Sequence, residues 1–371
     1  MRLKTALLVA STLILHGCFG GDSDDGDDTS IGQITLTGIG GLTYQTQSQR
    51  SLTDASGRYA YYPGETVDLS IGDLPVGIDI PTDDVITPLQ FLPETRNQLQ
   101  SSITDEYGFF SHKPVEKQVI QNPTLINITR FMMVMDDNET TNDGGNIYFT
   151  ARNISQLNQA MAYLPDSIDF TLPVSVFALD DEDTGAMSVA NQALAKICFY
   201  PPDDELCEDP PTQAEIDAAP APPEADMPRD ENIEYKDDLE NKRDRILAAI
   251  RKVGDVQLPD VEEYLLRELD KITTERTNRY YLSTVTANIS ASDTAIREVF
   301  VRLVGGEPSL QGLESVSTDE MAVVIHSTSA QTHSVEYFVA GAPEDESEVI
   351  VNFRPAGDYR WLRKPLRVII E

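Results

Sequence analysis

The sequence is poor in basic residues, histidine, cysteine and tryptophan. Its 371 residues contain 28 Lys and Arg against 62 Asp and Glu, which gives a formal net charge of −34, with only 4 His, 3 Cys and 1 Trp. A chain of this charge repels the phosphates of nucleic acid, and no basic patch with interleaved aromatic residues offsets the repulsion. We therefore exclude nucleic acid as a partner.

Motifs of known catalytic sites are also missing. The sequence has no Gly-x-Ser-x-Gly elbow, no His-Glu-x-x-His motif and no phosphate-binding loop. His326 and His333 lie in neighbouring strand-like runs and could pair as metal ligands, but nothing at ligand spacing joins them. Carboxylates are so numerous that a pair of them carries no information about acid–base chemistry. We expect no catalytic residue, no metal and no cofactor; an enzyme of unrecognised type stays an alternative.

The N-terminus holds the one marked apolar run. Thr5 to Leu15 follows two basic residues and is too short to cross a bilayer as a helix. It continues into Leu15-His16-Gly17-Cys18, which resembles the lipobox of bacterial lipoproteins, where a Cys follows a small residue and a Leu stands three positions earlier. His16 departs from the small residue that the family prefers. The resemblance implies that Cys18 becomes the acylated first residue of the mature protein; an ordinary secretory signal with an incidental Cys is the alternative.

Lipidation at Cys18 would place the chain on a membrane of the bacterial cell envelope, facing the periplasm. Phe19, rather than Asp, follows the Cys, and by the sorting rule of enteric bacteria this favours the outer membrane over the inner one. Gly20 to Ser30 has five Asp and no apolar residue, so it is expected to be an extended, self-repelling tether. Calcium binding by this segment is the alternative. Removal of Arg2 and Lys4 with the signal changes the charge from −34 to −36.

Two cysteines remain when Cys18 carries the lipid. Cys198 and Cys207 bracket a turn-rich loop that can bring them together. In an oxidising periplasm a disulfide is the expected outcome. A metal pair is the alternative, although no His or further Cys lies nearby.

The first part of the mature chain carries β signals. Short alternating runs lie between Ile34 and Leu89, with Thr53–Arg58 as a hairpin turn. This pattern resembles transthyretin-like and carboxypeptidase-regulatory modules, which are usually non-catalytic. Together with Thr87-Pro88-Leu89, it also resembles the N-terminal module of poorly characterised gammaproteobacterial envelope lipoproteins. That resemblance brings no activity with it.

Helical spacing dominates the middle of the chain. Asn122 is a suitable N-cap with Pro123 at the first helical position. The methionines that follow are expected to fill the core rather than to form a ligand surface, although both readings fit them: Met132, Met133 and Met135. The Asp136–Asn146 loop is the best candidate for a calcium site, but Thr141 replaces the EF-hand Gly, so a solvated loop is the simpler interpretation.

The C-terminal part returns to the two-residue period of strands. Six or seven such runs in about 90 residues favour an immunoglobulin-like sandwich. Before it, Asp260 with Glu263 is typical of a capping box that opens the second helix of a hairpin. The one basic cluster should neutralise an internal acidic face rather than bind a partner: Arg360, Arg363, Lys364 and Arg367.

These features predict a multidomain α+β protein. The predicted organisation is a signal peptide over 1–17, a lipid anchor and acidic tether over 18–32, a small β-sandwich over 33–90, a helical segment over 91–200, a Pro-rich acidic linker over 201–232, a helical hairpin over 233–277 and an immunoglobulin-like β-sandwich over 278–371.

The predicted function is that of a non-catalytic, membrane-anchored envelope lipoprotein that binds a protein partner or a hydrophobic small molecule. Its general plan resembles lipoproteins that serve beside FadL-type channels in alkane or lipid uptake. The alternatives are a surface adhesion or matrix-interaction protein and an unrecognised periplasmic enzyme. A large apolar cavity in the helical segment would favour ligand binding.

Overall fold

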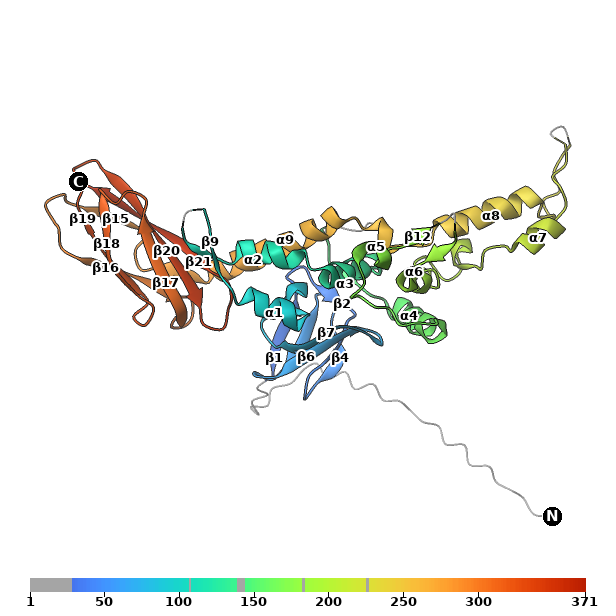
Figure 1. Ribbon diagram of the computed structural model, residues 1–371, viewed down its shortest axis with the longest axis horizontal. Helices are drawn as coiled ribbons and strands as arrows, with labels where there is room; N and C mark the ends of the chain where they lie inside the picture. The colour runs from blue at the N-terminus through green and yellow to red at the C-terminus, as the bar shows by residue number, and fades with distance from the viewer. Residues whose placement is uncertain (1–28, 107, 139–143, 182–183, 225–226) are drawn as a thin grey trace, which may run out of the picture.

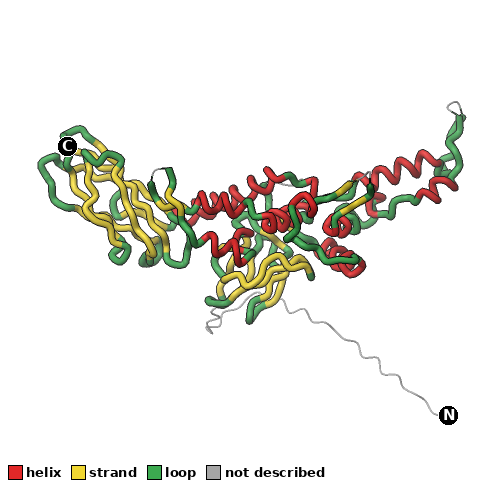
Figure 2. The backbone as a smooth tube through the Cα atoms, viewed as in Figure 1, coloured by secondary structure: helices red, strands yellow, loops and turns green. Residues whose placement is uncertain are grey.

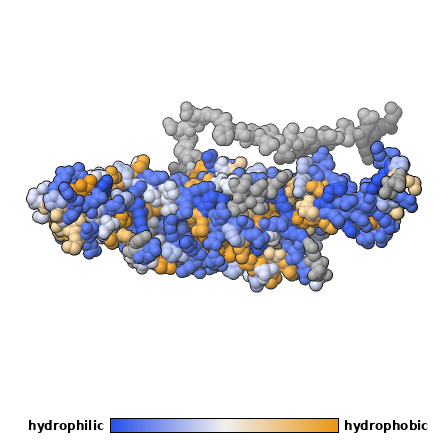
Figure 3. All heavy atoms as spheres, turned by 90° about the horizontal axis from the view of Figure 1, so that it is seen from above, coloured by the Kyte–Doolittle hydropathy of each residue, from blue (hydrophilic) through white to orange (hydrophobic). Residues whose placement is uncertain are grey.

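The protein is elongated and combines helices with several β-sheets, as predicted for an α+β chain. The computed structural model describes residues 29–106, 108–138, 144–181, 184–224 and 227–371. Strands gather at the C-terminal end, helices occupy the middle, and a helical arm extends at the opposite end (Figure 1). Coloured by secondary structure, the chain shows a second group of strands below the helices (Figure 2). Hydrophilic residues cover most of the face in Figure 3, with hydrophobic residues scattered among them.

An N-terminal β module, residues 30–86, contains two small sheets. The first, of order β4-β3-β6-β7, consists of β3 (Thr43–Gln45), β4 (Arg50–Leu52), β6 (Thr66–Ile71) and β7 (Leu74–Pro81). The second, of order β5-β1-β8, consists of β1 (Ser30–Ile34), β5 (Arg58–Tyr61) and β8 (Val85–Ile86). The predicted turn forms, with the Gly57 N–H donating to the Asp54 carbonyl at 2.8 Å. It joins strands of different sheets, however, so β4 and β5 are not a hairpin.

The helical segment shares one hydrophobic core with this module. Its helices are α1 (Pro93–Leu99), α2 (Lys113–Ile120), α3 (Pro123–Val134), α4 (Ala151–Tyr163), α5 (Val174–Phe177) and α6 (Val189–Leu194), with a 3₁₀ turn η1 (Pro88–Gln90) before them. Between them lie short strands β9 (Ile103–Thr104), β10 (Phe110–Ser111), β12 (Asp180–Asp181), β13 (Ala186–Met187), and β11 (Ile147–Tyr148), which pairs in parallel with β2 (Ile39–Gly40). The core therefore continues across the expected boundary at residue 90.

Helix α3 lies at the centre of that core. The Asn122 side chain accepts from the Leu125 N–H at 3.1 Å, which confirms the predicted cap. Every residue from Leu125 to Val134 is buried, the behaviour of a helix that is enclosed on all sides. The three methionines near its end are 0–2% exposed, so they fill the core as predicted.

Helix α9 (Leu258–Asn278) connects the helical body to the C-terminal strands. Val261, Tyr264, Leu265 and Leu269 lie in the first core, whereas the end of the helix packs on the strands that follow. The helix begins earlier than predicted: Gln257 is its N-cap, and the Asp260 carboxylate accepts the Gln257 N–H at 2.9 Å from the third helical position. Asp260 is therefore not the N-cap that the capping-box pattern indicated.

The expected hairpin and linker take a different form. Helix α8 (Lys236–Ala248) does not pack along α9 but lies beyond it on the long axis of the molecule (Figure 1). It contacts α7 (Gln213–Ala218) and the 3₁₀ turn η2 (Glu205–Cys207). A second turn, η3 (Val253–Asp255), separates α8 from α9. The Pro-rich segment thus folds back along α8, where Ile216 is buried, and forms an arm instead of a spacer.

Two four-stranded sheets, residues 280–370, form the C-terminal sheet pair. The first, of order β14-β16-β19-β18, consists of β14 (Tyr280–Leu282), β16 (Arg297–Leu303), β18 (Val323–Ser329) and β19 (Ser334–Val339). The second, of order β15-β21-β20-β17, consists of β15 (Thr286–Ile289), β17 (Leu310–Ser317), β20 (Glu346–Pro355) and β21 (Leu362–Ile370). A separate hydrophobic core lies in this part of the chain.

Candidate functional site

An apolar cleft of ≈ 640 Å³ lies between the N-terminal β module and the helical segment. Strand β7, helix α3, the end of α4 and the loop over residues 164–171 surround it. Apolar side chains form most of its wall, among them Val76, Ile78, Phe91, Ile128, Met161 and Phe170. Its size is within the roughly 300–1,000 Å³ of small-molecule pockets.

Strand β7 shapes one wall because its regular pairing breaks at Gly77. The register with β6 shifts there, and Ile78 beyond it is 50% exposed although it is a large apolar residue. A Cβ at Gly77 would approach the Ile80 Cδ1 to 2.8 Å and the Phe91 ring to 3.3 Å. Glycine therefore lets the strand lie close to Phe91 at the cleft.

The opposite wall depends on a proline and a buried amide. Helix α4 ends at Tyr163, and Leu164, which precedes Pro165, has an extended backbone with ψ 146°. A residue before proline disfavours the helical region, so the chain leaves the helix at this point and crosses the cleft. Asn127, fully buried on α3, donates to the carbonyls of Phe170 at 2.9 Å and Leu172 at 2.8 Å and so fixes the loop.

The cleft carries negative charge only. Asp73, Asp166 and Asp169 are its ionisable lining residues, all exposed at the surface, and no Lys, Arg or His of the described chain lines it. Asp169 accepts the N–H and hydroxyl of Thr171 at 2.9 and 2.7 Å. These hydrogen bonds hold the pKa of the Asp169 carboxyl below its usual range, so it is ionised at neutral pH.

A second cleft of ≈ 790 Å³, lined by charged, polar and apolar residues, lies between the helical body and the C-terminal sheet pair. His112 at its edge accepts the backbone N–H of Trp361 on Nδ1 at 3.1 Å. Burial, together with the smaller effect of the Arg360 charge, lowers the pKa of His112 to about 3, so the ring is neutral at neutral pH. Residues that line this cleft, among them His112 and Trp361, also make the contacts that join the helical body to the C-terminal sheet pair.

A buried ionic cluster lies beside His112 in that junction. Arg360 is 2% exposed; its Nη1 lies 3.3 Å from the Asp358 carboxylate and its Nε 3.7 Å from that of Glu116. The Tyr359 hydroxyl donates to Glu116 at 2.7 Å. Burial raises the pKa of Glu116, against the opposing effect of Arg360. These contacts join α2 to the segment before β21.

The basic cluster of the sequence is used internally, as predicted. Arg363 pairs with Asp105 at 2.5 Å across the junction, and Arg367 pairs with Glu346 at 2.6 Å within the sheet pair. Together with Arg360, three of the four basic residues meet carboxylates of the same chain.

The suggested metal ligands are not brought together. His326 lies 3.9 Å from Glu336 on the neighbouring strand, and His333 occupies the following turn with φ 58°. Within the described ranges no group of three or more His, Cys, Asp and Glu is placed to hold a metal ion. Asp136 accepts the Tyr148 N–H at 2.9 Å, but residues 139–143 of the suggested calcium loop lie outside the described residues.

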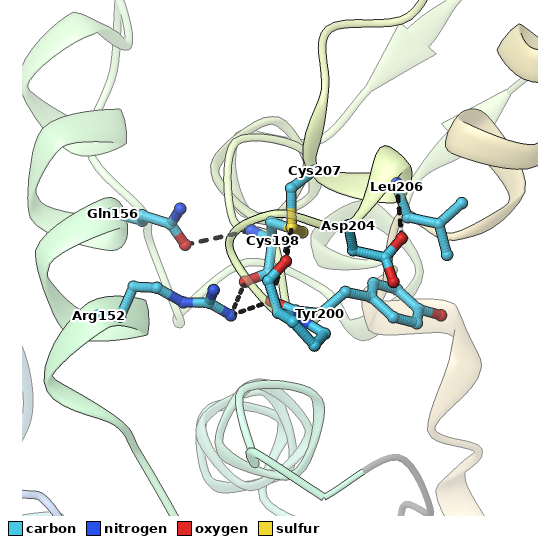
Figure 4. Close-up of a disulfide and its surroundings, with 8 residues drawn as sticks. Arg152, Gln156, Cys198, Tyr200, Asp204, Leu206 and Cys207 are labelled. Atoms are coloured by element: carbon cyan, nitrogen blue, oxygen red, sulfur yellow. Dashed lines mark hydrogen bonds between the residues drawn. A yellow bond between two sulfur atoms is a disulfide. The ribbon is translucent and has the colours of Figure 1, made fainter.

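Cys198 and Cys207 are joined as a disulfide, with the two Sγ atoms 2.03 Å apart, as the sequence predicted. Figure 4 shows how α4 holds this loop: Arg152 donates to the Cys198 carbonyl at 2.9 Å, and the Gln156 side chain accepts the Cys198 N–H at 3.1 Å. The bridge therefore lies where the arm leaves the helical body.

Replacing both cysteines by serine should destabilise the base of the arm by about 2–3 kcal/mol, because the closed loop restricts the unfolded chain. Hydrogen exchange should show faster exchange in η2 and α7, with β20 and β21 unchanged. Equal protection of the arm in the oxidised protein and the variant would contradict this role.

Cys18 lies outside the described residues. Among the helices of the described chain, none combines the length and apolar character needed to cross a bilayer. The sequence did not point to Gly77, Phe91 or Phe170 as cleft residues. The apolar run around Gly77 and the Leu164-Pro165-Asp166 break were the available signals.

Neither the models of known protein families nor the curated proteins give a match to this chain.

Proposed function

We propose that this chain is a non-catalytic envelope lipoprotein, anchored through Cys18, that binds a hydrophobic small molecule. The observation that supports ligand binding is the apolar cleft between β7, α3 and the loop over residues 164–171. The proposal rests on the lipobox-like Leu15–Cys18 motif for location, with the outer membrane favoured and an envelope protein as the expected partner. The immunoglobulin-like character of the C-terminal sheet pair belongs to the same proposal.

Filling the cleft should weaken binding without unfolding the protein. Met161 lines it and is only partly buried, so Met161→Trp adds volume at a flexible side chain. We expect an uncharged fluorescent probe, N-phenyl-1-naphthylamine, to bind the native protein and to lose about tenfold or more in affinity in this variant. Fluorescence titration measures the effect.

Tyr163→Trp is the matched control, because Tyr163 is 90% exposed on the same helix and does not line the cleft. It should bind the probe like the native protein. The affinity of alkyl ligands should also rise with chain length, by about fourfold for each buried methylene. Equal binding by all three proteins would place the probe elsewhere and overturn the cleft as the site.

The anchor has its own test. Cys18→Ala should move the protein from the membrane fraction to the soluble fraction of the periplasm, because the acylated residue is lost. Immunoblotting of fractionated cells measures the distribution. The disulfide variant, Cys198→Ser with Cys207→Ser, retains Cys18 and should stay with the membrane. Retention of Cys18→Ala on the membrane would contradict lipid anchoring.

A surface adhesion protein is the second candidate. The elongated shape and exposed apolar residues on the C-terminal sheet pair favour it, notably Val304 at 64% and Met321 at 84% exposure. Pull-down from native membranes separates the candidates: a channel or transport partner supports ligand delivery. Cleavage by protease added to intact cells supports adhesion.

A further inference from the structure

We propose that the apolar cleft selects chain-like ligands whose head group carries no negative charge, and discriminates against fatty acid anions. This inference rests on the proposed function, because it specifies the ligand of the same cleft. Its basis is the sign of the charge at the cleft. Asp73, Asp166 and Asp169 lie on its wall without a cation among the lining residues of the described chain.

One cation beside the cleft, Arg96 on α1, already donates hydrogen bonds through its Nη1. Arg96 Nη1 donates to the carbonyls of Gln90, Ile78 and Phe91 at 2.7, 3.2 and 3.3 Å. Two of these carbonyls belong to the cleft residues Ile78 and Phe91, so the guanidinium helps to hold this wall in place. A ligand carboxylate would have to compete with these three carbonyls for Nη1.

Helix α3 begins beside the cleft, and a helix N-terminus favours an anion. Here its donors are largely used: Pro123 has no N–H, the Leu125 N–H donates to the Asn122 side chain, and the Ile126 N–H donates to the Asn122 carbonyl. Thr124 is then the remaining donor of the first turn at the cleft. One N–H does not offset three carboxylates.

An anionic head group at the mouth of the cleft is therefore repelled by the carboxylates, and no lining cation offsets the repulsion. A hydroxyl or ester head group carries no charge and is not repelled. The alkyl chain of the ligand is buried to the same extent in both cases, so the head group determines the difference in affinity. For an assumed separation of about 8 Å between the head and each of the three carboxylates, Coulomb repulsion in water corresponds to about five- to tenfold weaker binding at roughly 10 mM ionic strength. At about 0.15 M salt the Debye length is about 8 Å, and the ratio should fall to about two- to threefold.

The test compares dodecanol, dodecanoate and dodecylamine as competitors of N-phenyl-1-naphthylamine on the full chain, at about pH 8 where the fatty acid is ionised. Dodecanol should displace the probe at about five- to tenfold lower concentration than dodecanoate at low salt. Dodecylamine should be at least as effective as dodecanol. The preference should shrink with added salt.

The variant Asp73→Asn with Asp166→Asn and Asp169→Asn should bring dodecanoate to within about twofold of dodecanol. Glu298→Gln with Glu320→Gln and Glu348→Gln changes the net charge equally on the C-terminal sheet pair and should keep the native preference. Equal binding of dodecanoate and dodecanol by the native protein would overturn the inference while leaving the binding function intact. Failure of the probe to bind would overturn the proposed function and this inference together.

Discussion

Replacing Arg360 by alanine is expected to lower the free energy of unfolding by about 3–5 kcal/mol, because it leaves the buried Glu116 carboxylate without its cation, whereas Asp358 keeps its ion pair with Arg276 at 3.3 Å. Glu116 and Asp358 are 4% and 6% exposed and lie within 3.7 and 3.3 Å of the guanidinium. The side chain also lies 4.2 Å from the centroid of the Tyr359 ring. Thermal and denaturant unfolding measure the loss, and hydrogen exchange should locate it at the junction.

Two comparisons separate charge from packing. Arg367→Ala removes an exposed cation from β21, and the unfolding curve should not change measurably. Arg360→Met combined with Glu116→Gln and Asp358→Asn removes the cluster as a unit and should lose less than half as much as Arg360→Ala, because no buried charge stays unpaired. If the triple variant were as unstable as Arg360→Ala, the ionic contribution would be negligible.

Acidification is expected to destabilise the folded protein through His112. Its pKa is about 3 when folded against an ordinary value of 6.5, so between these values the unfolded state binds a proton that the folded state does not. Stability from His112 is therefore fully present above about pH 6.5 and declines as the pH falls, by about 3 kcal/mol at about pH 4. Glu116, whose pKa is raised, acts in the opposite sense as the pH falls through its folded-state value.

The variant His112→Asn isolates this contribution, because the amide oxygen can accept the backbone N–H of Trp361 that Nδ1 accepts in the native protein. The free energy of unfolding, measured with denaturant at about pH 7 and about pH 4, should fall between these pH values by about 3 kcal/mol less in the variant than in the native protein. His326→Asn, at a half-exposed position on β18, should retain the native pH dependence. An unchanged pH dependence in His112→Asn would exclude His112 as the source.

Local signals predicted local structure well. The Asn122 cap and the Pro123 start of α3 need only neighbouring residues, and both are present. The nine-residue separation of Cys198 and Cys207 limits their distance whatever the rest of the chain does, so their pairing was accessible from the sequence. Apolar residues in alternation likewise predicted the strands of the C-terminal part.

Long-range packing was not predictable in the same way. The turn at Asp54–Gly57 forms, but which sheet receives β4 and β5 depends on pairing with β3 and β1. The hairpin of α8 and α9 was inferred from amphipathic faces, and a face does not name its partner: α9 packs on α3 and α8 on α7. The cleft likewise joins Gly77, Ile128 and Phe170, which the sequence separates by 40 residues or more.

By itself, the sequence determined the acidic charge, the α+β composition, the cysteine pair and the capped central helix, because each depends on composition or on neighbours. The location at the envelope remains a prediction from the Leu15–Cys18 motif. Only the tertiary structure decided that one core unites the β module, α3 and α9, and that an apolar cleft with a carboxylate rim lies between the β module and the helical segment. The physical reason is that burial is cooperative: a side chain becomes core, wall or rim according to which distant segments pack against it.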